Sequence, residues 1–204
     1  MGILDLDSEF MQAVGKIADY IILNLLCVLF SLPIVTMGAA MTAKFYVAMK
    51  MTRGEEPKVS QAFIKSFREN FKQVTKIWIV IVLIGAVVAW DWYSILYGKS
   101  QGMFLYGKIA FLVMTILFWS VAYNLCAFLA RFHMTTKEAI KGSLVFTFLN
   151  LPKMVLILLV TVLSYIIEAW YLEWALAIWL FFTTVTLYYV SKMYVKQFAK
   201  IEEQ

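Results

Sequence analysis

Charged side chains are scarce in this chain. Asp, Glu, Lys and Arg make up 15% of its 204 residues, whereas a soluble domain carries about 25%. Hydrophobic residues make up 63%, against about 45–50% in soluble domains. So few charges cannot cover a water-facing surface of this size, and so many apolar residues exclude a disordered chain. The composition therefore predicts an all-α, polytopic membrane protein.

Residues that carry common catalytic chemistry are scarce as well. His133 is the single histidine, and the two cysteines, Cys27 and Cys126, lie inside apolar runs. No His, Cys or carboxylate cluster has the spacing of a metal site. No nucleophile elbow, Gly-rich phosphate loop or zinc-peptidase motif is found. We therefore predict a protein that is not an enzyme and that binds no cofactor or metal.

Charge-free runs mark the membrane spans, since a helix needs about 20 residues to cross a bilayer. Within one membrane domain, residues 1–204, they predict five spans, at about 17–37, 75–97, 105–130, 152–171 and 173–194. Pro33 ends the first helix because proline lacks the N–H group that continues a helix. A sixth span over 34–51 stays open, because Lys44 costs about 2.5–3.5 kcal/mol at the centre of a spanning helix.

Lysines and arginines are divided unevenly between the two ends of these spans. Segment 38–76 holds eight of the eighteen basic residues, segment 131–153 holds four, and the C-terminal tail holds three. Basic residues that flank spans set membrane topology, so the net charge of +5 does not indicate a nucleic-acid partner. By the positive-inside rule these segments and the C-terminus face the cytoplasm. The N-terminus is outside with five spans and inside with six.

Two cytoplasmic segments, about 60–74 and 136–151, have the pattern of amphipathic surface helices. Thr135 and Glu138 have capping-box spacing at the start of the second. These helices serve either as basic anchors on anionic lipid or as docking elements for a partner protein. The docking interpretation uses the apolar residues Phe63, Phe67, Phe71, Ile140, Leu144 and Phe148.

Aromatic and acidic residues gather at the predicted outer face. They form either an ordinary aromatic belt at headgroup depth or a surface that contacts a sugar or a partner. The group consists of Trp90, Asp91, Trp92, Glu168, Trp170, Glu173 and Trp174. Deep in two of the predicted spans lie Asn24 and Asn124, for which we expect hydrogen bonds between helices.

One stretch resembles the YesL family of bacterial membrane proteins, whose function is unknown. It reads NLLCVLFSLPIVTMGAAMTAKFYVAMKMTRGEE over residues 24–56 and continues as FIKSFRENFKQ. The shared features are an asparagine in the first span, Ser-Leu-Pro with Thr36 and Gly38, and Arg-Gly before an Asn-Phe-Lys helix. Lys44 departs from the pattern, which has an apolar residue at this position. The resemblance implies no catalytic residues.

The resemblance also implies a genetic context, because such proteins tend to be encoded beside carbohydrate ABC importers and glycoside hydrolases. We therefore expect an accessory subunit of a carbohydrate ABC importer in the bacterial cytoplasmic membrane. Its expected partners are membrane lipid, the importer's permease or ATPase, and a solute-binding protein. Two alternatives stay open, namely a small oligomeric transporter or channel, and a membrane-bound regulator of sugar-utilisation genes.

Overall fold

The computed structural model describes residues 9–97, 105–132, 134–153, 155–157, 159 and 175–202. Every regular element in these ranges is helical, which confirms the predicted all-α class. In chain order the elements are α1 (Glu9–Ser31), the 3-10 turn η1 (Ile34–Thr36), α2 (Met37–Thr52), α3 (Val59–Tyr97), α4 (Leu105–Arg131), α5 (Thr136–Leu149) and α7 (Ala175–Glu202).

Three described helices are long and apolar enough to cross a membrane: α1 over Val14–Ser31, α3 and α4. A fourth is reached if Thr136–Leu149 and Leu151–Ile157, which meet at a bend of 84°, count as one span. The predicted count of five or six spans is not confirmed. The expected span over 152–171 lies largely outside the described residues. The 16 residues of α2 rise about 24 Å, less than the roughly 30 Å of a hydrocarbon core.

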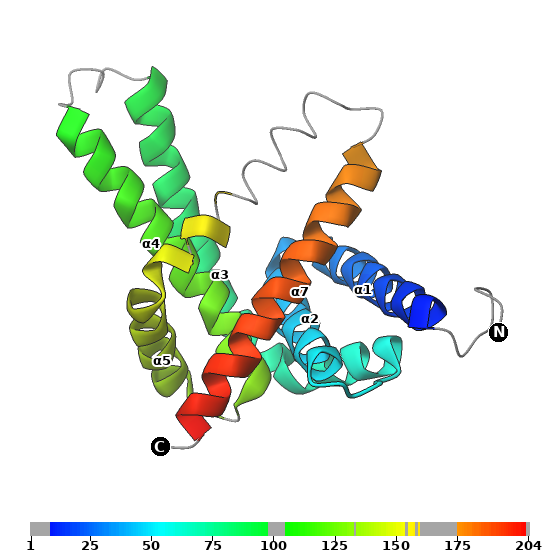
Figure 1. Cartoon of the computed structure of the whole chain (residues 1–204). Coiled ribbons are helices and arrows are strands. Elements are labelled where there is room, and N and C mark those ends of the chain that lie inside the picture. Colours follow the sequence, from blue (N-terminus) through cyan, green and yellow to red (C-terminus); the bar gives the residue numbers. More distant parts are fainter. Residues whose placement is uncertain are drawn as a thin grey trace.

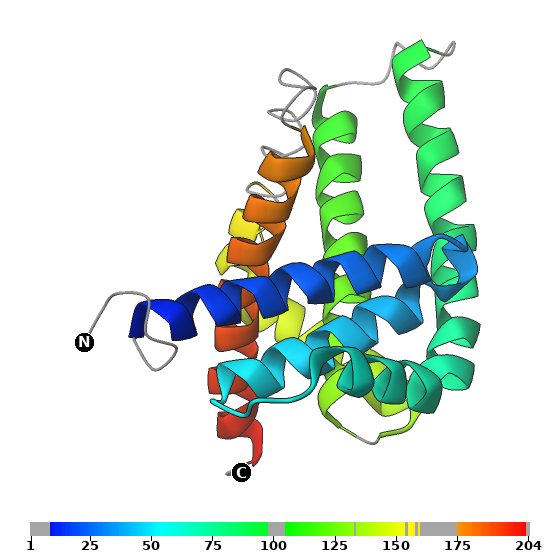
Figure 2. The same ribbon diagram turned by 90° about the vertical axis from the view of Figure 1, so that its right-hand side faces the viewer.

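The helices run in two directions (Figure 1). Most of α3, α4 and α7 stand side by side, whereas α1 and α2 lie across them (Figure 2). The expected surface helix at 60–74 and the expected span at 75–97 form one continuous helix, α3. Figure 2 shows that its first part also runs crosswise before the helix turns upright. The helix expected as a span at 17–37 is long and apolar enough to cross a membrane, and it lies crosswise to the upright helices (Figure 2).

The turn between α1 and α2 is closed by hydrogen bonds to backbone carbonyl oxygens. Pro33 follows the end of α1, as predicted, and leaves the last carbonyl oxygens of that helix without helical partners. The Thr36 hydroxyl donates to Phe30 O at 2.6 Å and to Pro33 O at 2.8 Å. Trp78 on α3 donates from Nε1 to Ile34 O at 2.9 Å. The tip of the α1–α2 hairpin is therefore fixed against α3.

Helix α2 is the most enclosed element of the described structure. It packs against α1, α3, α4 and α7. Small residues let these helices approach closely. The buried ones are Gly38, Ala39, Ala40, Thr42, Ala43 and Ala48. At Gly38 the approach is closest, because a Cβ atom there would lie 2.8 Å from Cγ and Cδ2 of Trp78.

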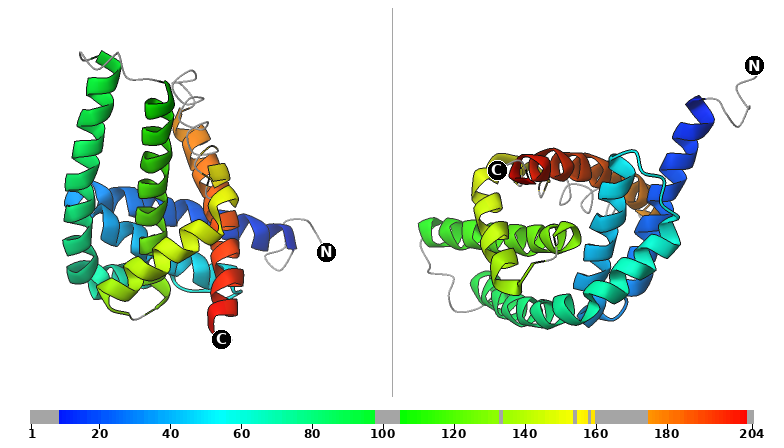
Figure 3. Two further views of the ribbon diagram at one scale, coloured as in Figure 1. Left: turned by 90° about the vertical axis from the view of Figure 1, so that its left-hand side faces the viewer. Right: turned by 90° about the horizontal axis from the view of Figure 1, so that it is seen from below.

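Aromatic side chains fill the space between α2, α4, α5 and α7. Tyr194 of α7 is fully buried, and its ring lies 5.4 Å from that of Phe146 on α5 and 5.6 Å from that of Phe45 on α2. Phe128 of α4 packs against Phe198 of α7 at 4.9 Å. Seen from below, α7, α2, the start of α3 and α5 surround α4 (Figure 3). The core therefore sits at one end of the upright helices.

The segments rich in lysine and arginine meet at this same end. The α2–α3 loop, the start of α5 and the C-terminus lie there, opposite the end of α3 and the start of α4 (Figure 2). Gly54 adopts a positive φ of 82° just after α2, which glycine accepts without strain. Arg53 then pairs with Glu55 at 2.7 Å. This hydrogen bond lowers the pKa of Glu55.

The contact between Gly38 and Trp78 predicts that Gly38→Ala destabilises the protein, because the added methyl group has no room. Overpacking of this kind costs about 1–3 kcal/mol. Gly15→Ala is the matched control, since no atom lies within 4 Å of a Cβ there and alanine favours the helix. Thermal unfolding in detergent micelles should show a lower midpoint for Gly38→Ala alone. Equal midpoints for the two variants would contradict the packing described here.

Candidate docking groove and buried polar contacts

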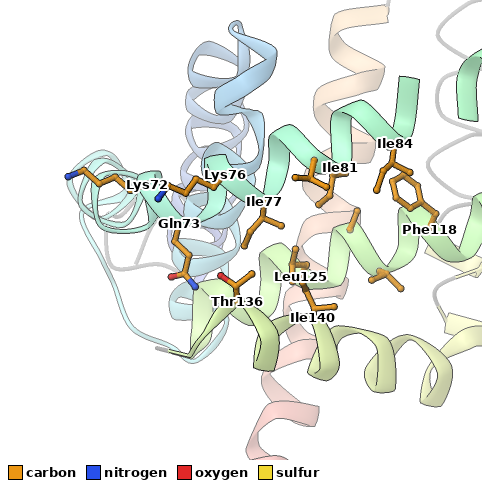
Figure 4. Close-up of a pocket in the computed structure, with 13 residues that line it drawn as sticks. Lys72, Gln73, Lys76, Ile77, Ile81, Ile84, Phe118, Leu125, Thr136 and Ile140 are labelled. Carbon is orange, nitrogen blue, oxygen red and sulfur yellow. The ribbon is translucent and has the colours of Figure 1, made fainter. Parts of the chain in front are cut away.

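A groove of about 720 Å³ runs between α3 and α4 and reaches the start of α5. Its walls are mainly aliphatic, with Ile77, Ile81 and Ile84 on α3 facing Phe118 and Leu125 on α4 (Figure 4). The three isoleucines are spaced four and three residues apart, so they lie on one face of the helix. The remaining lining residues are Lys72, Gln73, Lys76, Val80, Val121, Ala122, Thr136 and Ile140.

The two ends of the groove differ in chemistry. At the basic end, Gln73 donates from Nε2 to Met134 O at 3.1 Å and so joins α3 to the segment before α5. Lys72 and Lys76 also lie at this end (Figure 4). The other end is apolar and is lined by Ile84 and Phe118. This arrangement fits an apolar occupant that carries negative charge where it meets the basic end of the groove.

The predicted docking residues on α3 separate into inner and outer ones. Phe63 is fully buried and contacts Phe30 of α1 at 5.4 Å, so it is not available to a partner. Phe67 is half-buried and lies 4.9 Å from the same Phe30 ring. Phe71 is exposed. The apolar face of this helix therefore packs on α1 through Phe63 and Phe67. Phe71 is the one of the three predicted residues that is exposed.

Helix α5 keeps its predicted apolar stripe at the surface. Ile140, Leu144 and Phe148 are all exposed, and Ile140 also lines the groove. The helix packs inward through a different face, which holds Ala139, Ser143, Phe146 and Thr147. The capping box between Thr135 and Glu138 is confirmed, with both reciprocal hydrogen bonds formed. An apolar stripe therefore continues from the groove along α5.

Part of the predicted aromatic and acidic group at the far end of α3 lies at the surface. Trp90 and Asp91 are exposed. Trp92 instead turns toward α4, where its ring lies 5.3 Å from that of Phe111. The other members of the group, Glu168, Trp170, Glu173 and Trp174, lie outside the described residues.

The two asparagines predicted to join helices both make hydrogen bonds between helices. Asn24 on α1 donates to Thr184 Oγ1 on α7 at 3.0 Å. Asn124 on α4 donates to Thr147 Oγ1 on α5 at 2.7 Å and accepts a hydrogen bond from the Tyr194 hydroxyl on α7. One side chain therefore links three helices inside the apolar core.

The groove-lining isoleucines were not singled out from the sequence, although their helical spacing is visible there. In a chain that faces lipid, apolar residues surround a spanning helix on every side, so a stripe does not reveal which face meets protein. The described residues offer no group of three His, Cys, Asp or Glu side chains that could hold a metal ion. The arrangement is suited to binding an apolar surface.

Comparison with known proteins finds a family of unknown function that is similar to part of the chain. A family model described as a protein of unknown function, DUF624, matches residues 20–92. These residues cover the second half of α1, all of α2 and most of α3, and so include Asn24, Pro33, Gly38, Lys44 and Trp78. Neither the curated proteins nor the solved structures include a match to the chain. The match is consistent with the YesL resemblance, for which no named relative is found.

The Asn124 contacts predict that Asn124→Ala is destabilising by about 1–3 kcal/mol, because the buried Tyr194 hydroxyl loses its acceptor. Ser120→Ala is the control, since Ser120 is equally buried but donates only to Ile116 O of its own helix. Unfolding of Asn124→Ala, Tyr194→Phe and the double variant should give a coupling energy above about 0.5 kcal/mol. Additive effects would show that the two side chains do not interact.

Proposed function

We propose that this protein is a non-catalytic membrane subunit that binds an apolar transmembrane helix of a partner in the groove between α3 and α4. The partner we propose is the permease of a carbohydrate ABC importer. The observation that carries the proposal is the groove itself, an apolar channel of about 720 Å³ with walls from three helices. Helix–helix association in a bilayer depends on this kind of close packing, because burial in protein offers no hydrophobic gain over lipid.

Charge at one end of the groove supports a defined orientation of the partner helix. Lys72 and Lys76 lie one helical turn apart on α3 at the basic end. An acidic residue at the matching end of the partner helix would pair with them. Complementary charge of this kind fixes the register of two helices more than it adds affinity. Basic segments at this end also support a cytoplasmic position for the C-terminus.

The exposed stripe on α5 supports a second contact outside the bilayer core. Ile140 belongs both to the groove and to this stripe. A partner helix that leaves the groove at its basic end would meet Leu144 and Phe148 next. We propose that this stripe contacts a cytoplasmic segment of the permease or the importer's ATPase. Phe71 on α3 is exposed at the same end and is the only one of its three phenylalanines kept in this proposal.

The carbohydrate importer is proposed from the resemblance to the YesL family and its genetic context, since the family matched by the chain has no known function. A small oligomeric transporter and a membrane-bound regulator remain the competing functions. These functions and the proposal predict different proteins to co-purify with the chain when it is extracted from its native membrane.

A matched pair of substitutions on α3 tests the proposal. Ile84 lines the groove and is 45% exposed, whereas its neighbour Leu83 is 62% exposed and does not line the groove. Ile84→Trp places a bulky ring in the groove, and Leu83→Trp places the same ring on another face. Tagged variants would be extracted in mild detergent, and co-purifying proteins identified by mass spectrometry. We expect the importer subunits with the original protein and with Leu83→Trp, but not with Ile84→Trp.

Unfolding midpoints of both variants should match that of the original chain, which separates lost binding from lost folding. Recovery of the importer with Ile84→Trp would exclude the groove as the docking site. Recovery of the original protein alone, under conditions that keep a known importer intact, would contradict the accessory role. In that case, ligand-coupled transport in liposomes would favour the independent transporter, and lost gene induction in a deletion strain would favour the regulator.

A further inference from the structure

A second cavity lies on the other side of α2, between α1, α2, α4 and α7. Its volume is about 530 Å³, within the range of small-molecule binding sites. None of its lining residues belongs to the groove between α3 and α4. The hairpin of α1 and α2, which the docking proposal does not use, provides more than half of the cavity wall.

Lys44 of α2 is the only charged side chain among the described residues that line this cavity. It is half-buried, and four helices meet around the space that it faces. None of the ion pairs formed between described residues includes Lys44. An ammonium group held among apolar helices without a counter-charge is costly. A bound anion would remove that cost.

Polar groups near Lys44 could complete a site for an anionic group. Four hydroxyl-bearing residues line the same cavity, namely Ser31, Tyr123, Thr183 and Thr186, of which Thr183 donates to Trp179 O of its own helix. Asn24 also lines it; its buried Oδ1 atom has no hydrogen-bond partner among the described residues and, as an acceptor, suits the Lys44 ammonium group rather than an anion. Lysine supplies three donors to an anion. The cavity therefore combines one cation with hydroxyl groups in apolar surroundings.

The rim of the cavity is apolar and exposed. Leu32, at the tip of the hairpin, is 72% exposed, and Val28 and Met37 are exposed beside it. Val28 belongs to α1, Met37 begins α2, and Leu32 lies in the turn between the two helices. In a membrane, exposed apolar residues contact lipid chains. A lipid can therefore reach the cavity from the bilayer, whereas a soluble anion would have to cross an apolar surface.

We propose that this cavity binds the headgroup of an anionic phospholipid, with the phosphate paired to Lys44 and the lipid chains along the apolar walls. The ligand class follows from the single cation, the neighbouring hydroxyl groups and the lipid-facing rim. The site is independent of the proposed docking groove, so the failure of either proposal leaves the other intact.

Native mass spectrometry of the full chain in mild detergent, titrated with phosphatidylglycerol or phosphatidylcholine, tests this site. We expect the original protein to retain one phosphatidylglycerol under conditions that remove phosphatidylcholine. Lys44→Met should weaken that binding by about tenfold or more, because a charge-assisted contact is lost. Lys44→Arg keeps the positive charge and should retain the lipid. Lys16→Met, which removes an exposed charge from α1, should leave binding unchanged.

Met41→Trp gives an independent readout, because it narrows the cavity without changing Lys44. It should also weaken phosphatidylglycerol binding, and unfolding midpoints would show that each variant folds. Equal binding of both lipids, or unchanged binding by folded Lys44→Met, would overturn the proposal. Binding of free glycerol 3-phosphate as tightly as the lipid would show a soluble-anion site and would overturn the lipid assignment.

Discussion

Close packing around α2 is the constraint on which the rest of the structure depends. This helix of 16 residues contacts α1, α3, α4 and α7, and small side chains make these approaches possible. Gly38 sits against the ring of Trp78, and the Nε1 atom of that ring holds the Ile34 carbonyl at the hairpin turn. A single tryptophan therefore fixes both the distance and the register between the hairpin and α3.

The two proposed sites both arise from this packing. Because α2 and the aromatic cluster hold the helices together at one end, α3 and α4 leave an apolar groove along their upright parts. On the opposite side of α2, the crosswise hairpin encloses Lys44 with α4 and α7. In a bundle of parallel spans, neighbouring helices would fill the groove and the cavity beside Lys44. The crosswise course of α1 and α2 keeps them open (Figure 2).

Local features of the structure could be predicted from the sequence better than the tertiary arrangement. The break at Pro33 and the capping box at Thr135 depend on neighbouring residues, and both are found. Phe63 and Phe67 were expected at the surface, but they pack on Phe30. A helical stripe shows that a face is apolar and does not show whether protein or lipid covers it. The direction of α1 is equally hidden, because its apolar composition is the same whether the helix spans the membrane or lies across the upright helices.

The depth of the two ends of α1 tests the central claim most directly. Single spin labels at Val14 and Leu32, with Cys27 and Cys126 replaced by alanine, would report depth in liposomes through their relative accessibility to oxygen and to a water-soluble nickel chelate. A crosswise α1 predicts similar depths for both labels. A spanning α1 would separate them by about 27 Å along the membrane normal. Labels near opposite membrane surfaces would contradict the arrangement in which α1 and α2 lie across the upright helices.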